Sequence, residues 1–416
     1  MAIIKPFRAF RPRREVAPMV AAFPYDVMDT EEARGMAEGN PYSFLHVSRP
    51  EIDLPPDTDP YSMEVYLKGR DNLREFIKNG TLVQDQSECY YVYRQRMGGI
   101  IQTGLVVCAG VDDYQSGVIK KHELTRADKE EDRVRHIDYL NANDEPVFYT
   151  YRSDAGSCAI AAQIEEIVAR DPLYDFTTDD GLTHTLWIVD DKKEITWLTA
   201  NFTAIKNLYV ADGHHRSAAA SRVRELRKNE NPSHSGEEEY NFFLTVIFPD
   251  LEMNVMPYNR VVRDLNGHNI AEFMVAIARR FEISPVREPL QPCRRHQFGM
   301  FLSGKWYELS PKEGTVDEND AVAALDVSIL QDNLLSPLLG VRNPRSDQRI
   351  NFVGGIRGLE ELERLVNIGE YHVAFSLYPT SIGELINLAD AGKIMPPKST
   401  WFEPKLRSGL FVHMLT

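Results

Sequence analysis

The spacing of apolar residues in the first 110 positions predicts short helices, one strand and a hairpin. Capping and stop residues predict a helix that starts at Asp29 and ends at Gly39, and helical spacing predicts another from Tyr61 to Asn79. The apolar run from Phe44 to Val47 predicts a strand. Two further apolar runs flank a Gly-Gly pair and predict a β-hairpin, with strands at residues 89–96 and 100–109.

From about residue 111, short apolar runs alternate with longer amphipathic segments. The short runs predict strands at residues 146–151, 186–189, 208–211 and 242–248. The longer segments predict helices at residues 125–141, 159–170, 198–207 and 215–227. The last third predicts helices at residues 270–281, 322–333, 359–365 and 382–391, a hairpin at 300–309 and a strand at 372–377. This mixture predicts an α/β fold.

Length and charge narrow the class of protein. The chain has 416 residues, which is too long for one ordinary core, and the pattern changes divide it into regions 1–111, 112–252 and 253–416. A formal net charge of −15 argues against nucleic acid and anionic membranes as partners. No apolar run reaches the length of a membrane helix, and the four cysteines form no C-x-x-C pair. We therefore expect a cytoplasmic protein that binds small molecules, with a homodimer left open.

The sharpest local signal is a glycine turn between a buried strand and a helix, Asp212-Gly213-His214-His215-Arg216-Ser217. Gly213 permits a left-handed backbone, and the helix start presents unpaired amides at the positive end of its dipole. Arg216 can grip phosphate oxygens in a bidentate fork, and the two histidines can donate hydrogen bonds or move protons. This combination predicts a phosphate site.

Two other interpretations of the turn stay open. Asp212 can serve as a simple helix cap beside ordinary surface histidines. Alternatively, Asp212, His214 and His215 can bind a metal ion, although adjacent histidines usually cannot both reach one ion. The sequence otherwise predicts no metal site held by the protein itself. It also contains no Walker loop, G-x-G-x-x-G, G-x-S-x-G or H-E-x-x-H motif.

A second candidate site precedes the charged helix at residues 125–141. His122 and Glu123 stand at the loop mouth, where a carboxylate can act as a general base. Thr125 is predicted to cap the helix, with Asp128 as its partner. Lys129, Arg133 and His136 then share one helical face, although such a face is often merely solvated. His122, Thr125, Lys129 and Arg133 are candidate contacts of a substrate.

Two further segments supply weaker candidates for ligand contacts. The tail brings Lys398 and Arg407 close to prolines and aromatic residues, as a basic strap over a ligand or as a packed C-terminal arm. Near the N-terminus, Asp26 is either a ligand contact or part of a turn.

Several of these motifs occur in an order that resembles one family across nearly the whole chain. They are Phe23-Pro24-Tyr25-Asp26-Val27, Asn40-Pro41-Tyr42-Ser43-Phe44-Leu45-His46-Val47, Arg49-Pro50-Glu51, His122-Glu123-Leu124-Thr125, the turn from Ala211 to Arg216, and Met395-Pro396-Pro397-Lys398-Ser399-Thr400-Trp401-Phe402. They resemble the DUF1015 family of bacterial and archaeal proteins, which is related to the free serine kinases. The resemblance implies a core like that of ParB and sulfiredoxin, which we place at residues 112–252.

The resemblance also implies an activity and roles for the site residues. It implies phosphorylation of L-serine to O-phospho-L-serine with ATP or ADP, with Mg²⁺ accompanying the nucleotide. The Asp-Gly-His-His-Arg turn of those kinases cradles nucleotide phosphates, which matches the turn from Asp212 to Arg216. The base that deprotonates serine corresponds to Glu123 by order and context. We expect His214 or His215 to offset charge on the transferred group, and Lys398 and Arg407 are candidates to bind the serine carboxylate or a phosphate.

Two other functions stay open at this point. ParB-like domains use their phosphate turn to sense nucleotide, so a non-catalytic nucleotide-binding switch is one alternative. A metal-dependent phosphohydrolase is the other. The large N- and C-terminal regions, which compact serine kinases lack, leave the acceptor undetermined.

Overall fold

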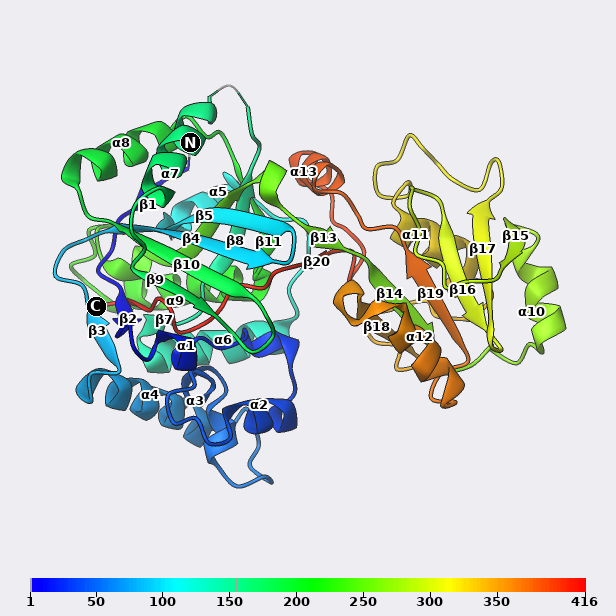
Figure 1. The fold of residues 1–416 in the computed structure, drawn as a ribbon, viewed down its shortest axis with the longest axis horizontal. Helices are drawn as coiled ribbons and strands as arrows, with labels where there is room; N and C mark the ends of the chain where they lie inside the picture. Colours follow the sequence, from blue (N-terminus) through cyan, green and yellow to red (C-terminus); the bar gives the residue numbers. More distant parts are fainter. Residues whose placement is uncertain (1, 155) are drawn as a thin grey trace. The chain divides into compact units, whose positions relative to one another are not determined.

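The computed structural model describes residues 2–154 and 156–416 and forms two compact units (Figure 1). The first unit contains Met1–Met253 and the returning tail Pro404–Thr416, and the second contains Asn254–Glu403. The division after Met253 lies next to the predicted boundary at residue 252. No division falls at residue 111, because strands from both sides of that position belong to one sheet. The tail from Pro404 belongs to the first unit, in contrast to the predicted region 253–416.

One large mixed sheet organises the first unit. Its strand order is β6 (Ile119–Lys120), β11 (Leu208–Asp212), β8 (Val147–Tyr151), β12 (Phe242–Pro249), β5 (Ile100–Gly110), β4 (Tyr90–Met97), β10 (Thr183–Val189) and β9 (Tyr174–Thr177), and β1 (Ile4–Lys5) also pairs with β5. β6 runs parallel to β11 and β12 parallel to β8, whereas the other pairs are antiparallel. The predicted α/β class is confirmed, and so is the hairpin of β4 and β5. A ParB/sulfiredoxin-like core stays a prediction.

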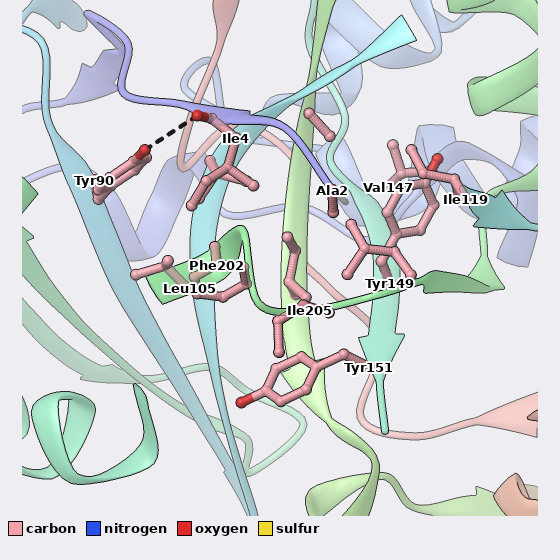
Figure 2. Packing of buried hydrophobic residues seen from close by; sticks show 14 of the residues in the cluster. Ala2, Ile4, Tyr90, Leu105, Ile119, Val147, Tyr149, Tyr151, Phe202 and Ile205 are labelled. Atoms are coloured by element: carbon pink, nitrogen blue, oxygen red, sulfur yellow. Dashed lines mark hydrogen bonds between the residues drawn. The ribbon is translucent and has the colours of Figure 1, made fainter. Parts of the chain in front are cut away.

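The core of this unit lies against the central strands. Helices α5 (Val111–Ser116), α7 (Cys158–Val168) and α8 (Lys192–Phe202) contribute apolar side chains to it. Figure 2 shows Phe202 and Ile205 packed near Tyr151, and Tyr90 donating a hydrogen bond to the carbonyl of Ile4. Leu208 and Val210 of β11 belong to the same cluster. The strand that ends at the candidate phosphate turn is therefore rigidly held.

A second helical layer adjoins the long helices α6 (Ala127–Leu140) and α9 (His214–Glu230), which pack together through Val134 and Val223. It contains α1 (Ala17–Val20), α2 (Thr30–Ala37), α3 (Leu45–Ser48) and α4 (Met63–Lys78). α4 packs against α6 and against α3. Two short sheets complete the unit, β2 (Phe10–Pro12) with β3 (Leu82–Gln84) and β7 (Ala142–Asn143) with β21 (His413–Met414).

Some predicted elements differ from the structure. The strand predicted at Phe44 to Val47 is wrong, because the segment forms α3 and buries Phe44 under Gly409 of the tail. A short apolar run does not distinguish a buried strand from a buried helix. The helix predicted at 198–207 begins earlier, since Asp191 caps α8 by accepting from the amides of Lys193 and Glu194.

The second unit is built on an antiparallel sheet. Its order is β15 (Phe281–Val286), β17 (Lys305–Pro311), β16 (Phe298–Leu302), β19 (Val373–Leu377), β14 (Tyr258–Val262) and β18 (Ile350–Gly354), and β13 (Val255–Met256) pairs separately with β20 (Trp401–Phe402). Its helices are α10 (Ile270–Ile277), α11 (Asp326–Leu330), α12 (Gly358–Asn367) and α13 (Ile382–Asp390). Among the helices that the structure describes, none has both the length and the apolar character needed to cross a membrane.

Candidate functional site

Two loops meet because β6 and β11 are parallel neighbours. Ile119 pairs with Leu208, and Lys120 pairs with Tyr209. The carboxyl ends of parallel strands open at the same edge of a sheet, where ligands commonly bind. The loop with His122 and Glu123, which follows β6, therefore lies beside the turn that follows β11. The two strongest candidates from the sequence come together in this way.

The turn has the backbone conformation that a phosphate site requires. Gly213 has φ 93° and precedes the first residue of α9. A β-bulge between Val210 and Asp212 shifts the register with β8 just before it. The first bond of the helix is from the Ser217 amide to the Gly213 carbonyl, at 2.9 Å. The amides of His214 and Arg216 therefore have no acceptor within the helix.

A side chain at position 213 would collide with the neighbouring strand. A Cβ built there lies 2.5 Å from Cγ1 of Val147 and 3.2 Å from Nε of Arg216. The close approach of strand and helix thus requires glycine for its missing side chain as well as for its left-handed backbone.

Asp212 pairs with Lys405, a buried cation of the basic tail, and the sequence did not indicate this pairing. Its Oδ2 accepts from Nζ of Lys405 at 2.8 Å, and its Oδ1 accepts from the Gly213 amide at 2.7 Å. Burial opposes ionisation of Asp212, but Lys405 and Arg216 outweigh it and hold its pKa well below the usual range. The interpretation of Asp212 as a plain helix cap therefore misses its charge partner, which comes from the distant tail.

The guanidinium of Arg216 lies beside the turn, with Nε 3.2 Å from the Cβ position of residue 213 and an Nη 4.0 Å from Oδ1 of Asp212. One Nη donates to the Pro146 carbonyl, and the side chain is buried. Burial disfavours its charge, but the carboxylates of Asp26 and Glu145 keep its pKa above the ordinary value. Its Nε has no hydrogen-bond partner, and the bidentate phosphate contact expected from the sequence stays a prediction. Asp26 lies in the 3-10 turn η1 (Tyr25–Val27) and acts on this guanidinium.

His122, Glu123 and His214 converge on one point. Their ligand atoms, one from each side chain, all lie within 4.8 Å of one another. The two imidazole rings meet edge to face, with centroids 4.4 Å apart. Burial lowers the pKa of His122 to about 4, and burial together with the neighbouring His122 lowers the pKa of His214 well below its usual range. Both rings are therefore neutral at physiological pH.

The remaining residues of the turn and loop have structural partners. Nε2 of His215 accepts from the Arg126 amide at 3.1 Å, which ties the turn to the start of α6. The Ser217 hydroxyl donates to the Gly213 carbonyl at 3.0 Å and contacts the Tyr149 hydroxyl at 2.8 Å. The cap predicted at Thr125 is wrong, because α6 begins at Ala127 and the Thr125 hydroxyl donates to Glu130.

The face of α6 predicted to contact substrate does line a cavity. Lys129, Arg133 and His136 border a cavity of about 280 Å³, together with residues of the η1, α2 and α4 segments. Nζ of Lys129 donates to the Tyr61 hydroxyl at 2.8 Å. Arg133 pairs with Asp132 at 2.9 Å and stacks over Tyr25, with one Nη left without a hydrogen-bond partner. Arg133 and His136 also border a small internal void that reaches Arg216.

The two basic tail residues occupy different units. Arg407 is buried in the first unit, where it pairs with Asp180 and stacks over the Phe23 ring. Lys398 belongs to the second unit, where its Nζ lies 5.4 Å from the centroid of the Tyr258 ring. Each cation thus lies against an aromatic ring of its own unit, and Arg407 also has a carboxylate partner.

Comparisons with known proteins identify a family. The family model described as "Protein of unknown function (DUF1015)" matches residues 4–328. No curated protein matches the chain.

Among solved structures, "Free serine kinase in complex with AMP" is 12% identical, covers 72% of this chain and 86% of its own, and has a TM-score of 0.34. A conserved hypothetical protein from Pyrococcus furiosus is 12% identical, covers 73% of this chain and 93% of its own, and has a TM-score of 0.34. SbnI with C-terminal truncation from Staphylococcus aureus is 10% identical, covers 73% of this chain and 85% of its own, and has a TM-score of 0.36.

Proposed function

We propose a phosphoryl-transfer activity for this chain, which belongs to the DUF1015 family. The proposed reaction is the phosphorylation of free L-serine to O-phospho-L-serine at the expense of ATP or ADP. One observation carries the proposal. A carboxylate and two neutral imidazoles converge beside a glycine turn that opens a long helix, whose first amides have no acceptor within the helix. The choice of serine follows the resemblance of the sequence motifs.

The residues at the turn fit the terminal phosphates of a nucleotide. The amides of His214 and Arg216 lack intrahelical acceptors, and the dipole of α9 favours negative charge at this end. Lys405 donates to Asp212, and Arg216 has an Nη 4.0 Å from Oδ1 of Asp212, so both add positive charge close by. Arg216 also donates to the Pro146 carbonyl, which holds its guanidinium beside the turn. Mg²⁺, when bound with the nucleotide, neutralises phosphate charge.

Glu123 is the proposed base. Its carboxylate lies within 4.8 Å of ligand atoms of His122 and His214, at the edge where the turn opens. In the transfer, the serine hydroxyl oxygen bonds to the terminal phosphorus, and the bond from that phosphorus to the leaving ADP or AMP breaks. The hydroxyl proton passes to Glu123. His214 or His215 stabilises the charge on the transferred group by donating a hydrogen bond, and phosphoryl transfer otherwise requires mainly positioning.

The cavity along α6 is the proposed place for the amino acid. Its volume of about 280 Å³ exceeds that of a serine molecule and leaves room for bound water. The unpartnered Nη of Arg133 is a suitable donor to the serine carboxylate, and Lys129 is a second cation on the same wall. The role of Asp26 is to balance the charge of Arg216, and Arg407 remains a proposed contact of the carboxylate or a phosphate.

The test is a screen of the amino acids with ATP and with ADP in the presence of Mg²⁺, in which phosphorylated product is measured by mass spectrometry. Serine is expected to be phosphorylated. Glu123→Gln is expected to lower kcat by about 10²–10⁴-fold, since general-base catalysis contributes that much. Asp128→Asn is the matched control, because this exposed carboxylate of the same segment pairs with Arg126.

The alternatives give distinct outcomes in the same screen. Phosphate release without any phosphorylated amino acid would indicate a phosphohydrolase. Nucleotide binding without turnover, unchanged in Glu123→Gln, would indicate a nucleotide-binding switch. Either result would contradict the kinase proposal.

A further inference from the structure

Two buried imidazole nitrogens at the site have no hydrogen-bond partner. They are Nδ1 of His122 and Nε2 of His214. His122 is 2% exposed and His214 is 6% exposed, so solvent does not satisfy these atoms. Buried polar atoms in native proteins are almost always paired, and an exception calls for an unseen partner such as an ion.

The other contacts of His122 fix which nitrogen is available. Its ring is hydrogen-bonded to the Val210 carbonyl on β11. With Nδ1 unpartnered, Nε2 is the nitrogen that donates, and Nδ1 then carries a lone pair. Histidines that bind metal ions commonly donate their second ring nitrogen to a backbone carbonyl, which orients the ring in this manner.

We propose that His122 Nδ1, His214 Nε2 and the Glu123 carboxylate bind one divalent transition-metal ion of the zinc class. Two imidazoles and one carboxylate form a donor set that zinc uses when one coordination position is left open. Magnesium prefers oxygen ligands, so the two imidazoles favour zinc or cobalt over it. The site differs from the set of Asp212, His214 and His215 that the sequence left open.

The geometry requires only small side-chain movements. Tetrahedral bonds of about 2.1 Å place ligand atoms roughly 3.4 Å apart. The three ligand atoms here lie within 4.8 Å of one another. Glu123 is half-buried and follows the short strand β6. The low pKa values of both histidines agree with neutral rings that can bind metal without losing a proton.

The open coordination position would let a metal ion bind a further ligand beside the start of α9. His214 is the first residue of α9, so the ion lies next to the amides at the start of that helix. A water molecule or a phosphate oxygen can occupy the fourth position. A Glu123 carboxylate bound to the ion does not also accept the serine proton, so this metal site and the role of Glu123 as base describe different states of the chain. Metal binding is measurable without nucleotide or serine.

The experiment is a Co²⁺ titration of the full chain after dialysis against a chelator, followed by the visible absorption of bound cobalt and then by Zn²⁺ competition. One equivalent per chain is expected to bind and to be displaced by Zn²⁺. His214→Ala and Glu123→Gln are each expected to weaken binding by at least tenfold, because losing even an outer partner of a metal ligand costs about 10–100-fold. His372→Ala is the control, since it removes an exposed histidine of the second unit.

Circular dichroism checks that each variant is folded, and Glu123→Gln keeps the test valid if His214→Ala does not fold. Equal affinity in the native chain and in the folded variants would overturn the proposal, as would the absence of cobalt absorption in the native chain. A chain that binds cobalt through these residues but phosphorylates no amino acid would retain the metal site and lose the kinase assignment. A chain that phosphorylates serine but binds no cobalt would retain the kinase assignment and lose the metal site.

Discussion

Gly213→Ala tests whether the glycine turn is as tightly constrained as the structure indicates. Two costs combine at this position. The backbone has φ 93°, and a left-handed conformation costs an L-residue about 1–2 kcal/mol. The added Cβ also meets Cγ1 of Val147 at 2.5 Å, and overpacking of this kind costs about 1–3 kcal/mol. We therefore expect a loss of roughly 2–5 kcal/mol in the free energy of unfolding of the first unit.

Gly236→Ala is the matched control. Gly236 has φ 95°, almost the same as Gly213, but a Cβ there meets nothing within 4 Å. This variant therefore has the backbone cost alone, about 1–2 kcal/mol. The difference between the two variants isolates the collision with Val147, and it is expected to be about 1–3 kcal/mol.

The assay is urea unfolding followed by tryptophan fluorescence. Replacing Trp306 and Trp401, both in the second unit, by phenylalanine leaves Trp187 and Trp197 to report the first unit. Equal midpoints and slopes for Gly213→Ala and Gly236→Ala would refute the reasoning, because they would mean that β8 and α9 are not in close contact at the turn.

Three further predictions concern charges. Lys405→Met removes the ammonium partner of Asp212 and is expected to lower the free energy of unfolding of the first unit by about 3 kcal/mol. Adding Asp212→Asn should recover part of that stability in urea unfolding. Glu239 contacts His413 and has a pKa lowered from 4.5 to about 2, with burial opposing the shift. The ionised Glu239 contributes about 1–2 kcal/mol to stability after solvent screening, and this stability is present above pH 4.5 and lost as the pH falls through 2. Glu239→Gln should therefore make the free energy of unfolding depend less on pH between 4.5 and 2. Burial raises the pKa of Asp326 from 3.8 to about 6. Its stabilisation is complete below pH 3.8 and lost as the pH rises through 6, so Asp326→Asn should stabilise the second unit above pH 6 by at most about 3 kcal/mol, and an unchanged melting temperature at pH 8 would contradict this.

Local chemistry was readable from the sequence wherever the signal lay within one segment. The turn from β11 to α9 was predicted because a glycine follows a buried strand and precedes a helix. The β4–β5 hairpin was predicted from two apolar runs around a glycine pair. The short run at Phe44 to Val47 gave the wrong element, because a run of this length fits a buried helix as well as a strand, and the contact of Phe44 with Gly409 of the tail is a tertiary one.

The sequence by itself determined the class of fold, the glycine turn and the residue types able to hold a phosphate. Only the tertiary structure decided which of those residues meet. The parallel pairing of β6 and β11 brings His122 to His214 across about ninety positions of the chain, and the returning tail brings Lys405 to Asp212. It also brings the guanidinium of Arg216 to the Pro146 carbonyl. Spacing along a chain does not encode such distances, because they depend on strand order and on how buried charges find partners across the whole fold.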